Sequence, residues 1–394
     1  MRRRVLAGVA GWLGVLGVVA LAVHPEPCPP ASPAEIHEAA DRAVGWFGVN
    51  RLDGGRYRYR WNRDLGEPEP GYNDVRHVGV MSALYHATGA GIDGALDAAD
   101  HGRAYVDEHL VETPAGPAFG RGDPVRSGST ALLVTALDQR WEATGSDRDR
   151  ELLRRLGGTL AASVGPGGEV AADIDVEEGP VAGTTSPFFT GEVAWALARL
   201  HLRFPDAGFD DATLRIRRYV IEDRDRAEPR FPPLSDHWMG YALSTMATWP
   251  AAPEPPGATA AGEGWRDRQL GLLGVQVRYE SQRQGGITTL TRGSDGSAAG
   301  IGTLGEGLAG HLGVPGSIEG AAREGALERL VCVAGLLEDR QDRSDDPRTS
   351  GAWFSGGVTQ MDDQQHALSA LLLTEALLAS EPAPSGAGDE EETP

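Results

Sequence analysis

The sequence predicts an all-α fold, an (α/α)6 toroid of six helical hairpins with short β segments in its loops. Two observations support this prediction. A small, apolar helical stretch followed by a more charged one recurs about every 58 residues, which is typical of repeated helical hairpins. The last copy has no polar outer face of the kind that caps an open solenoid, so we expect the hairpins to close into a ring.

The amino-terminal segment, residues 1–24, is typical of a membrane anchor or a signal peptide. Arginines at positions 2–4 precede the uncharged residues 6–23. As a helix these residues would rise about 27 Å, close to the hydrocarbon thickness of a bilayer. We expect a single membrane-spanning helix with the arginines in the cytoplasm and the remaining chain outside the cytoplasm. The alternative is a cleaved signal peptide, which would leave the protein secreted.

The rest of the chain divides into a proline-rich linker (25–31), a folded toroid domain (32–379) and an acidic tail that we expect to be disordered (380–394). The segment Ser32-Pro33-Ala34-Glu35 is typical of a helix start. In an oxidising compartment, Cys28 and Cys332 could form a disulfide. We favour the other interpretation, in which Cys332 is simply a buried apolar residue, because it lies in the run LVCVAGLL.

The helices of the hairpins follow in order along the folded domain. The first helix of each hairpin is rich in Ala, Gly, Ser and Leu, so we expect it in the inner ring; the second carries more charge and should lie outside. First helices are expected at 75–88, at 127–144, from Phe188, from Asp236, near Gly305 and from Met361. Second helices of the first three hairpins are expected at 94–110, at 147–163 and from Asp211.

Composition and motifs exclude several classes of function. The net charge of −21 repels nucleic acid and anionic surfaces, so we expect no nucleic-acid partner. Two cysteines are too few for a four-cysteine zinc site. The sequence contains no Gly-x-Gly-x-x-Gly after a strand, no Walker A motif and no His-Glu-x-x-His, so we expect no cofactor and no metal ion.

Polar residues interrupt the apolar runs at the first turns of the predicted inner helices. In a toroid these turns converge on one face, so we expect them at the mouth of a central cavity. Each residue alone is commonly a helix cap, but together they indicate a polar pocket. The substrate-binding candidates among them and in the adjoining loops are Asn73, Asp74, Arg76, His77, Arg126, His237, Trp238, Trp353 and Gln365.

Two glutamates are the leading candidates for a catalytic acid. Glu192 and Glu306 lie between small, apolar neighbours, where burial should raise the pKa of a carboxyl group. A general acid needs such a raised pKa. A buried salt bridge to an arginine is the alternative. In a hydrolase the second carboxylate would be Asp236 or Asp363.

A lyase or an epimerase would use a histidine instead. His77, His237 or His366 would remove the proton next to a uronate carboxylate held by Arg76. Aromatic side chains in the loops, Trp238 among them, would then stack on sugar rings. Simple packing of the loops is the alternative for these aromatic residues.

The segments YNDVRHVG, FFTGEVAWALARLH, SDHWMGYAL and GGVTQMDDQQHALSALL resemble the α/α-toroid proteins. Within them the chain is similar to six-hairpin glycosidase-like and glucuronyl C5-epimerase-like domains, which implies action on sugar chains. It is more distantly similar to terpene cyclases and prenyltransferases. His366 to Leu371 resembles the prenyltransferase run that follows a zinc-binding histidine, but the Asp-x-Cys pair expected with it is missing, as is the Asp-x-Asp-Asp motif of the cyclases.

Three functions follow from these patterns. We expect a membrane-anchored carbohydrate-active enzyme outside the cytoplasm, either a glycoside hydrolase or a lyase or epimerase of acidic glycans, with a glycan substrate. A non-catalytic cell-surface scaffold that binds a glycan or a protein is the alternative. A terpenoid cyclase is a third reading, and it requires an apolar, aromatic-lined cavity.

Overall fold

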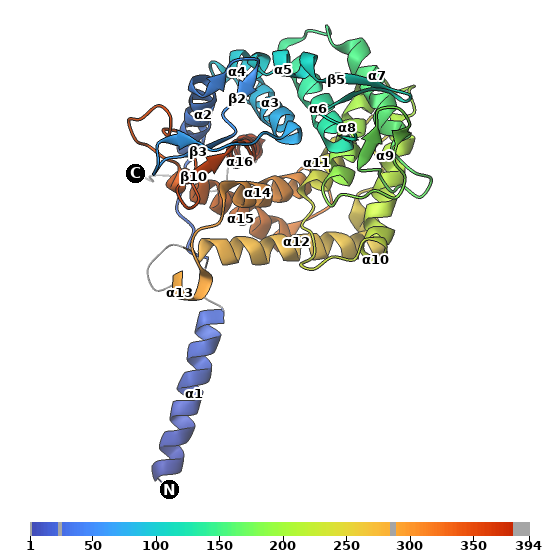
Figure 1. Cartoon of the computed structure of the whole chain (residues 1–394). Coiled ribbons are helices and arrows are strands. Elements are labelled where there is room, and N and C mark those ends of the chain that lie inside the picture. The colour runs from blue at the N-terminus through green and yellow to red at the C-terminus, as the bar shows by residue number, and fades with distance from the viewer. Residues whose placement is uncertain (1, 23–25, 284–288, 381–394) are drawn as a thin grey trace, which may run out of the picture.

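Six helices form a closed inner ring. The computed structural model describes residues 2–22, 26–283 and 289–380. Each inner helix packs against the next, and the last packs against the first, which confirms the predicted toroid (Figure 1). The inner helices are α3 (Asp74–Gly89), α6 (Ser127–Thr144), α8 (Phe189–Arg203), α11 (His237–Met246), α14 (Ala298–Leu312) and α16 (Met361–Ser380).

Outer helices surround this ring and cover it. They are α4 (Ala95–His101) with α5 (Arg103–Glu108), α7 (Arg150–Ala162), α9 (Phe209–Arg218), which continues through Tyr219–Asp223 into α10 (Arg224–Ala227), α12 (Ala260–Ser281), α15 (Gly320–Arg340) and α2 (Pro33–Val49). The helix α2 packs on α16, so the sixth hairpin joins the first helix of the domain to the last. The Ser32 side chain and Glu35 form the predicted capping box at the start of α2.

Glycines allow the inner helices to lie at backbone contact. A Cβ atom on Gly302 of α14 would be 2.4 Å from the backbone of His366 on α16. A Cβ atom on Gly310 would be 2.5 Å from the backbone of Gly240 on α11. Both distances are too short for any side chain, so these glycines set how closely α14 approaches its two neighbours.

Short antiparallel strands lie in the loops, as predicted. The sheet β10-β3-β4 joins the segment before α16 to the segment before α3, and the sheet β7-β8-β9 joins the segment before α6 to the loop before α8. These two sheets therefore lie at the amino-terminal ends of inner helices. The strands are β1 (Arg51–Leu52), β2 (Arg56–Tyr57), β3 (Arg60–Asn62), β4 (Glu67–Pro68), β5 (Leu110–Thr113), β6 (Gly116–Phe119), β7 (Val125–Arg126), β8 (Asp173–Asp175), β9 (Gly179–Pro180) and β10 (Val358–Gln360); two short helical segments, Pro256–Ala258 and α13 (Thr289–Arg292), complete the structure.

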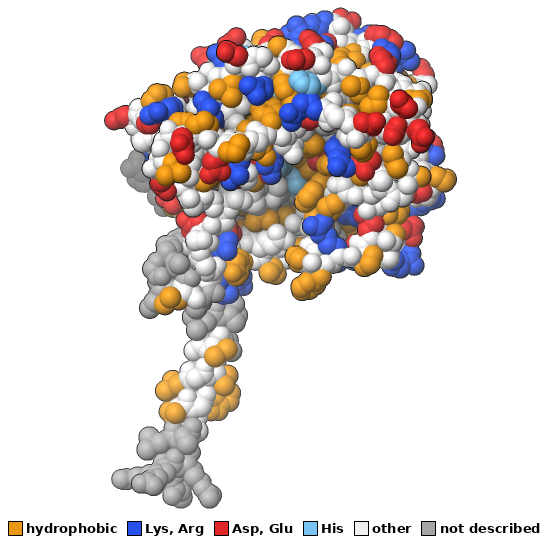
Figure 2. Space-filling model, in the orientation of Figure 1, with side chains coloured by type: hydrophobic (Ala, Val, Ile, Leu, Met, Phe, Trp, Pro, Cys, Tyr) orange, Lys and Arg blue, Asp and Glu red, His pale blue; other side chains and the backbone are white. Residues whose placement is uncertain are grey.

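The helix α1 (Arg2–Ala22) projects away from the toroid (Figure 1). Its described side chains are apolar or small, in contrast to the charges of both signs on the toroid (Figure 2). Trp12 and Leu13 are exposed. A membrane-crossing helix, judged by length and hydrophobicity, is not found among the residues that the structure describes. The anchor predicted at residues 6–23 therefore stays a prediction. All of the predicted acidic tail except Ser380 lies outside the described residues.

The segment after α1 is fastened to the outer helix α15, where the sequence suggested a simple spacer. Cys28 and Cys332 form a disulfide. Arg329 forms an ion pair with Glu26 at 3.1 Å, which adds a second contact between the same two segments. The favoured interpretation of Cys332 as an unpaired apolar residue was therefore wrong. Cys332 is buried as its apolar neighbours predicted, but the proline-rich segment brings Cys28 onto the same face of α15.

Candidate active site

A buried carboxylate, Glu306, lies at the centre of a small polar cluster between three inner helices. One carboxylate oxygen accepts a hydrogen bond from His366 Nδ1 at 2.7 Å. The other accepts one from the Tyr241 hydroxyl at 3.1 Å. His237 Nε2 lies 3.7 Å from the oxygen that His366 contacts. Glu306 has a glycine on either side: a Cβ atom on Gly305 would lie 2.9 Å from Ala370 of α16, and one on Gly307 would lie 2.9 Å from Leu273 of α12.

The two histidines of the cluster have opposite protonation states at neutral pH. Burial disfavours a charge on His366, but the charge and hydrogen bond of Glu306 outweigh it and raise the pKa of His366 to about 9. Burial, followed by repulsion from His366, lowers the pKa of His237 well below its usual value. The two rings are 5.3 Å apart between centroids. The cluster thus places a charged imidazolium beside a neutral imidazole.

Glu192 is a third buried acid beside this cluster. Among the described residues, its Oε2 atom has no hydrogen-bond partner. Burial raises the pKa of the Glu192 carboxyl to about 8, and only the charge of His366 opposes that rise appreciably. The carboxyl group packs against Gly128 of α6, where any side chain would collide with it. Glu192 is therefore mainly neutral at pH 7, as its apolar neighbours predicted.

The two aspartates proposed as second carboxylates make structural contacts. Asp236 caps α11 through the backbone N–H of Met239 and forms a buried ion pair with Arg224. Asp363 accepts a hydrogen bond from the backbone N–H of Ala299 at the start of α14. Burial raises the pKa of Asp363 to about 6. Both groups therefore hold helix starts in place.

The predicted binding residues at the first turns of α3 and α6, and Trp353 in the loop before β10, also contact the protein itself. Arg76 pairs with Asp362 at 3.2 Å and donates hydrogen bonds to Tyr59 and Gln360. His77 is buried, and burial lowers the pKa of its ring to about 3. The others make the following contacts: Asn73 caps α3, Asp74 pairs with Arg121, Arg126 pairs with Asp173, and the Trp353 indole donates to the backbone of Leu337.

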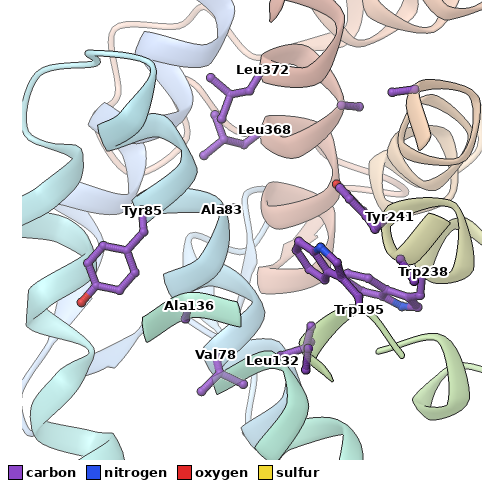
Figure 3. Close-up of a cluster of buried hydrophobic side chains, with 14 of the residues drawn as sticks. Val78, Ala83, Tyr85, Leu132, Ala136, Trp195, Trp238, Tyr241, Leu368 and Leu372 are labelled. Carbon is purple, nitrogen blue, oxygen red and sulfur yellow. The ribbon is translucent and has the colours of Figure 1, made fainter. Parts of the chain in front are cut away.

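A cavity of about 720 Å³ lies inside the ring. Trp195 of α8 projects into the space between the inner helices, and its ring stacks on Tyr241 at 4.4 Å and on Trp238 at 5.6 Å (Figure 3). Of the predicted site residues, the cavity lining includes Trp238, Glu306 and Gln365. Trp195 and Tyr241 were not among the site residues predicted from the sequence. Their spacing, three residues after Glu192 and four after His237, places them on the same helix faces one turn deeper.

The cavity opens at the end of the ring opposite to the predicted one. Its lining reaches the last turns of the inner helices, at Ala90, Ala143, Arg199, Thr245 and Ala379. The mouth was predicted at the first turns, but the loops and small sheets that precede the inner helices bury most polar side chains there. Loop packing of this kind has no simple signal in the helical periodicity of the sequence.

The described ligand atoms of His237, Glu306 and His366 lie within 4.8 Å of one another, an arrangement that a metal ion could use. The 2.7 Å separation of His366 Nδ1 from Glu306 is that of a charge-assisted hydrogen bond. A metal ion would have to displace the proton held there. As it stands, the cluster is arranged to share protons.

Neither a family model nor a curated protein sequence matches the chain. Among solved structures it is similar to the GH76A alpha-1,6-mannanase from Salegentibacter sp. HEL1_6, with 12% identity, a TM-score of 0.58, and coverage of 88% of this chain and 100% of that chain. It is also similar to the cellobiose 2-epimerase from Bacillus thermoamylovorans B4167, with 11% identity, a TM-score of 0.57, and coverage of 88% of this chain and 99% of that chain. A third similar structure is the type II terpene cyclase MstE from Scytonema, with 13% identity, a TM-score of 0.52, and coverage of 88% of this chain and 98% of that chain. The chain thus shares the α/α-toroid fold of these proteins.

Proposed function

We propose that the chain is a carbohydrate-active enzyme that transfers protons on a sugar bound in the central cavity. One observation carries this proposal: Glu306 joins His366 and Tyr241 by hydrogen bonds in the lining of a cavity that Trp195, stacked on Tyr241, also lines. Aromatic rings offer stacking surfaces to the C–H faces of sugars, and the cluster offers groups that donate and accept protons. Fold relatives include a mannanase, also solved in complex with alpha-1,6-mannotriose, and a cellobiose 2-epimerase.

The pair of histidines fits an isomerase or an epimerase best. Neutral His237 would take a proton from the carbon next to a sugar carbonyl, and charged His366 would give one to the carbonyl oxygen. His237 would then return its proton to carbon, and a hydroxyl of the enediol would return a proton to His366 as the carbonyl forms again, so the isomer or epimer is produced with both histidines restored and without any other reactant. Glu306 would hold His366 in its charged form and fix the orientation of its ring.

Glycoside hydrolysis is the second candidate. It is favoured by Glu192, which is protonated at neutral pH and would serve as the acid, while Glu306 would be the second carboxylate. Glu192, like His237 and His366, is absent from the described cavity lining, and hydrolysis stands second because His366 bonds directly to the lining residue Glu306 at 2.7 Å. A terpenoid substrate is less suitable, because the cavity lining includes the polar side chains of Ser82, Gln139 and Ser369 in addition to apolar groups.

The proposal includes a location outside the cytoplasm, with attachment through residues 6–23 or release after cleavage. The disulfide between Cys28 and Cys332 supports an oxidising compartment. Cell fractionation with an antibody to the toroid would test this part. A cytoplasmic protein with both thiols reduced would contradict it.

The enzymatic proposal is tested by incubating the full chain with neutral and uronic oligosaccharides and following the products by mass spectrometry and NMR. An unchanged mass with new sugar proton signals would support epimerisation or isomerisation. Shorter chains would support hydrolysis and bring Glu192 forward. Loss of either activity in Glu306→Gln, with full activity in the exposed control Glu177→Gln, would assign the site. No product from any sugar would favour a non-catalytic binding scaffold.

A further inference from the structure

The geometry points to a substrate route through the end of the ring at which the inner helices terminate. We infer that an uncharged saccharide enters there and reaches Glu306 and Trp195 from that side. The inference rests on the proposed function, since it takes the ligand to be a sugar. It adds the direction of entry and the charge of the ligand.

The lining of the cavity shows where it opens. At its inner end the wall is formed by buried residues, among them Gly79, Trp238 and Glu306. Toward the last turns the lining residues become exposed, as at Gly89 of α3, Glu142 of α6 and Ala376 of α16. The cavity therefore reaches the protein surface between the last turns of the inner helices.

The opposite end of the ring is filled by side chains that bond to one another. Gln365 packs directly against Gly79, where even a methyl group would collide with its amide. Asp236 is held by Arg224, and Asp363 by the backbone of Ala299. Entry of a ligand from this end would break buried hydrogen bonds and ion pairs. Breaking them is unfavourable, because buried polar groups would lose their partners.

The charges along the cavity wall are already paired. Glu306 is bound by His366, and the Arg199 guanidinium contacts Asp138 and Glu142. Glu375 near the opening contacts His37 at 2.9 Å. Burial lowers the pKa of His86 to about 4, so this ring is neutral.

This pairing selects against an ionic ligand. A uronate carboxylate or a phosphate would lose its hydration without gaining an unpaired cation among the described lining residues, which is unfavourable. Arg76, which the sequence predicted to hold a uronate, is absent from that lining and is paired with Asp362. Hydroxyl groups of a neutral saccharide can instead bond to Ser82, Gln139 and Ser369 beside the stacked aromatic rings.

The test blocks one end of the ring at a time. Ala376→Trp adds a large side chain at the exposed end of the cavity, and Ala143→Trp does so from a second helix, in case the first variant folds poorly. The matched control is Gly300→Trp, at an exposed position in the first turn of α14. Isothermal titration calorimetry of each full-length variant would use alpha-1,6-mannotriose, cellobiose and a trimer of galacturonate, and circular dichroism would confirm folding.

We expect a neutral sugar to bind the unmodified chain, with the affinity reduced at least about tenfold in the two rim variants and changed less than about twofold in Gly300→Trp. Wild-type affinity in both folded rim variants would overturn the entry route, even if the chain turns over sugars. Tighter binding of the galacturonate trimer would overturn the choice of an uncharged ligand. Absence of binding by every sugar would overturn this inference together with the proposed function.

Discussion

Replacing Glu192 by glutamine should change how the stability of the protein depends on pH. The Glu192 carboxyl is buried, and its pKa is raised from 4.5 to about 8 in the folded chain. Between these two pH values the folded state keeps a proton that the unfolded chain releases. Stability conferred by this group is therefore lost as the pH rises through that window.

The size of the effect follows from the shift. Each pH unit within the window changes the free energy of unfolding by about 1.4 kcal/mol per proton, so the ceiling between pH 5 and pH 8 is about 4 kcal/mol. Glutamine has nearly the same shape and stays neutral, so Glu192→Gln should match the parent protein near pH 4.5 and exceed its stability at pH 8.

Urea unfolding followed by tryptophan fluorescence at several pH values would measure the difference. The control is Glu177→Gln, because Glu177 is exposed and its replacement should leave the pH profile unchanged. Parallel curves for the parent and Glu192→Gln would refute the reasoning, since they would mean that Glu192 is ionised in the folded protein. Such a result would also remove the support for Glu192 as a hydrolytic acid.

Three further predictions concern other contacts. Serine at both Cys28 and Cys332 should lower the free energy of unfolding by at most about 5 kcal/mol, since the disulfide spans 304 residues; equal urea midpoints would contradict this. Asp236→Asn should lower the free energy of unfolding by about 3 to 5 kcal/mol, because Arg224 would stay buried without its charged partner. The kcat of the folded fraction should stay near that of the parent protein. A lower kcat at unchanged stability would instead make Asp236 catalytic. Glu306→Gln should abolish turnover. It should also remove a stabilisation that is complete below pH 6.5 and is lost as the pH rises through about 9, the pKa of His366, which Glu306 binds. Melting temperatures measured between about pH 6 and 10 would show this loss, and an unchanged pH profile would contradict the pairing.

The ring could be predicted from the sequence because each inner helix is buried on nearly all sides. Such burial is reflected in the amino-acid composition, because the first helix of each hairpin is rich in small and apolar residues and the second carries more charges. The order of the helices, and the start of α2 at Ser32, followed from the same patterns. The pairing of α2 with α16 did not, because contacts between the two ends of a chain have no local signal.

The burial of Glu192 and Glu306 was predictable, but the partner of Glu306 was not. Small neighbours on the same helix indicated that both carboxyl groups would lose water. The sequence suggested an arginine as the partner in a salt bridge, and the structure instead has His366. Which side chain meets Glu306 depends on how far α14 and α16 slide past each other. That offset is set by glycine contacts such as the one at Gly302, which the sequence alone does not reveal.

The buried cluster is costly for a protein to maintain, which bears on its role. Glu306 and His366 lose their hydration, and an apolar pair of the same shape commonly gives equal or greater stability. Asp236 and Arg224 face a similar cost, but they also cap α11 and hold its first turn. Glu306 sits mid-helix, where no cap is needed, and its group is the one beside a cavity wide enough for a sugar. The position of this charged pair is therefore explained by the proposed proton transfer in the cavity better than by the stability of the ring.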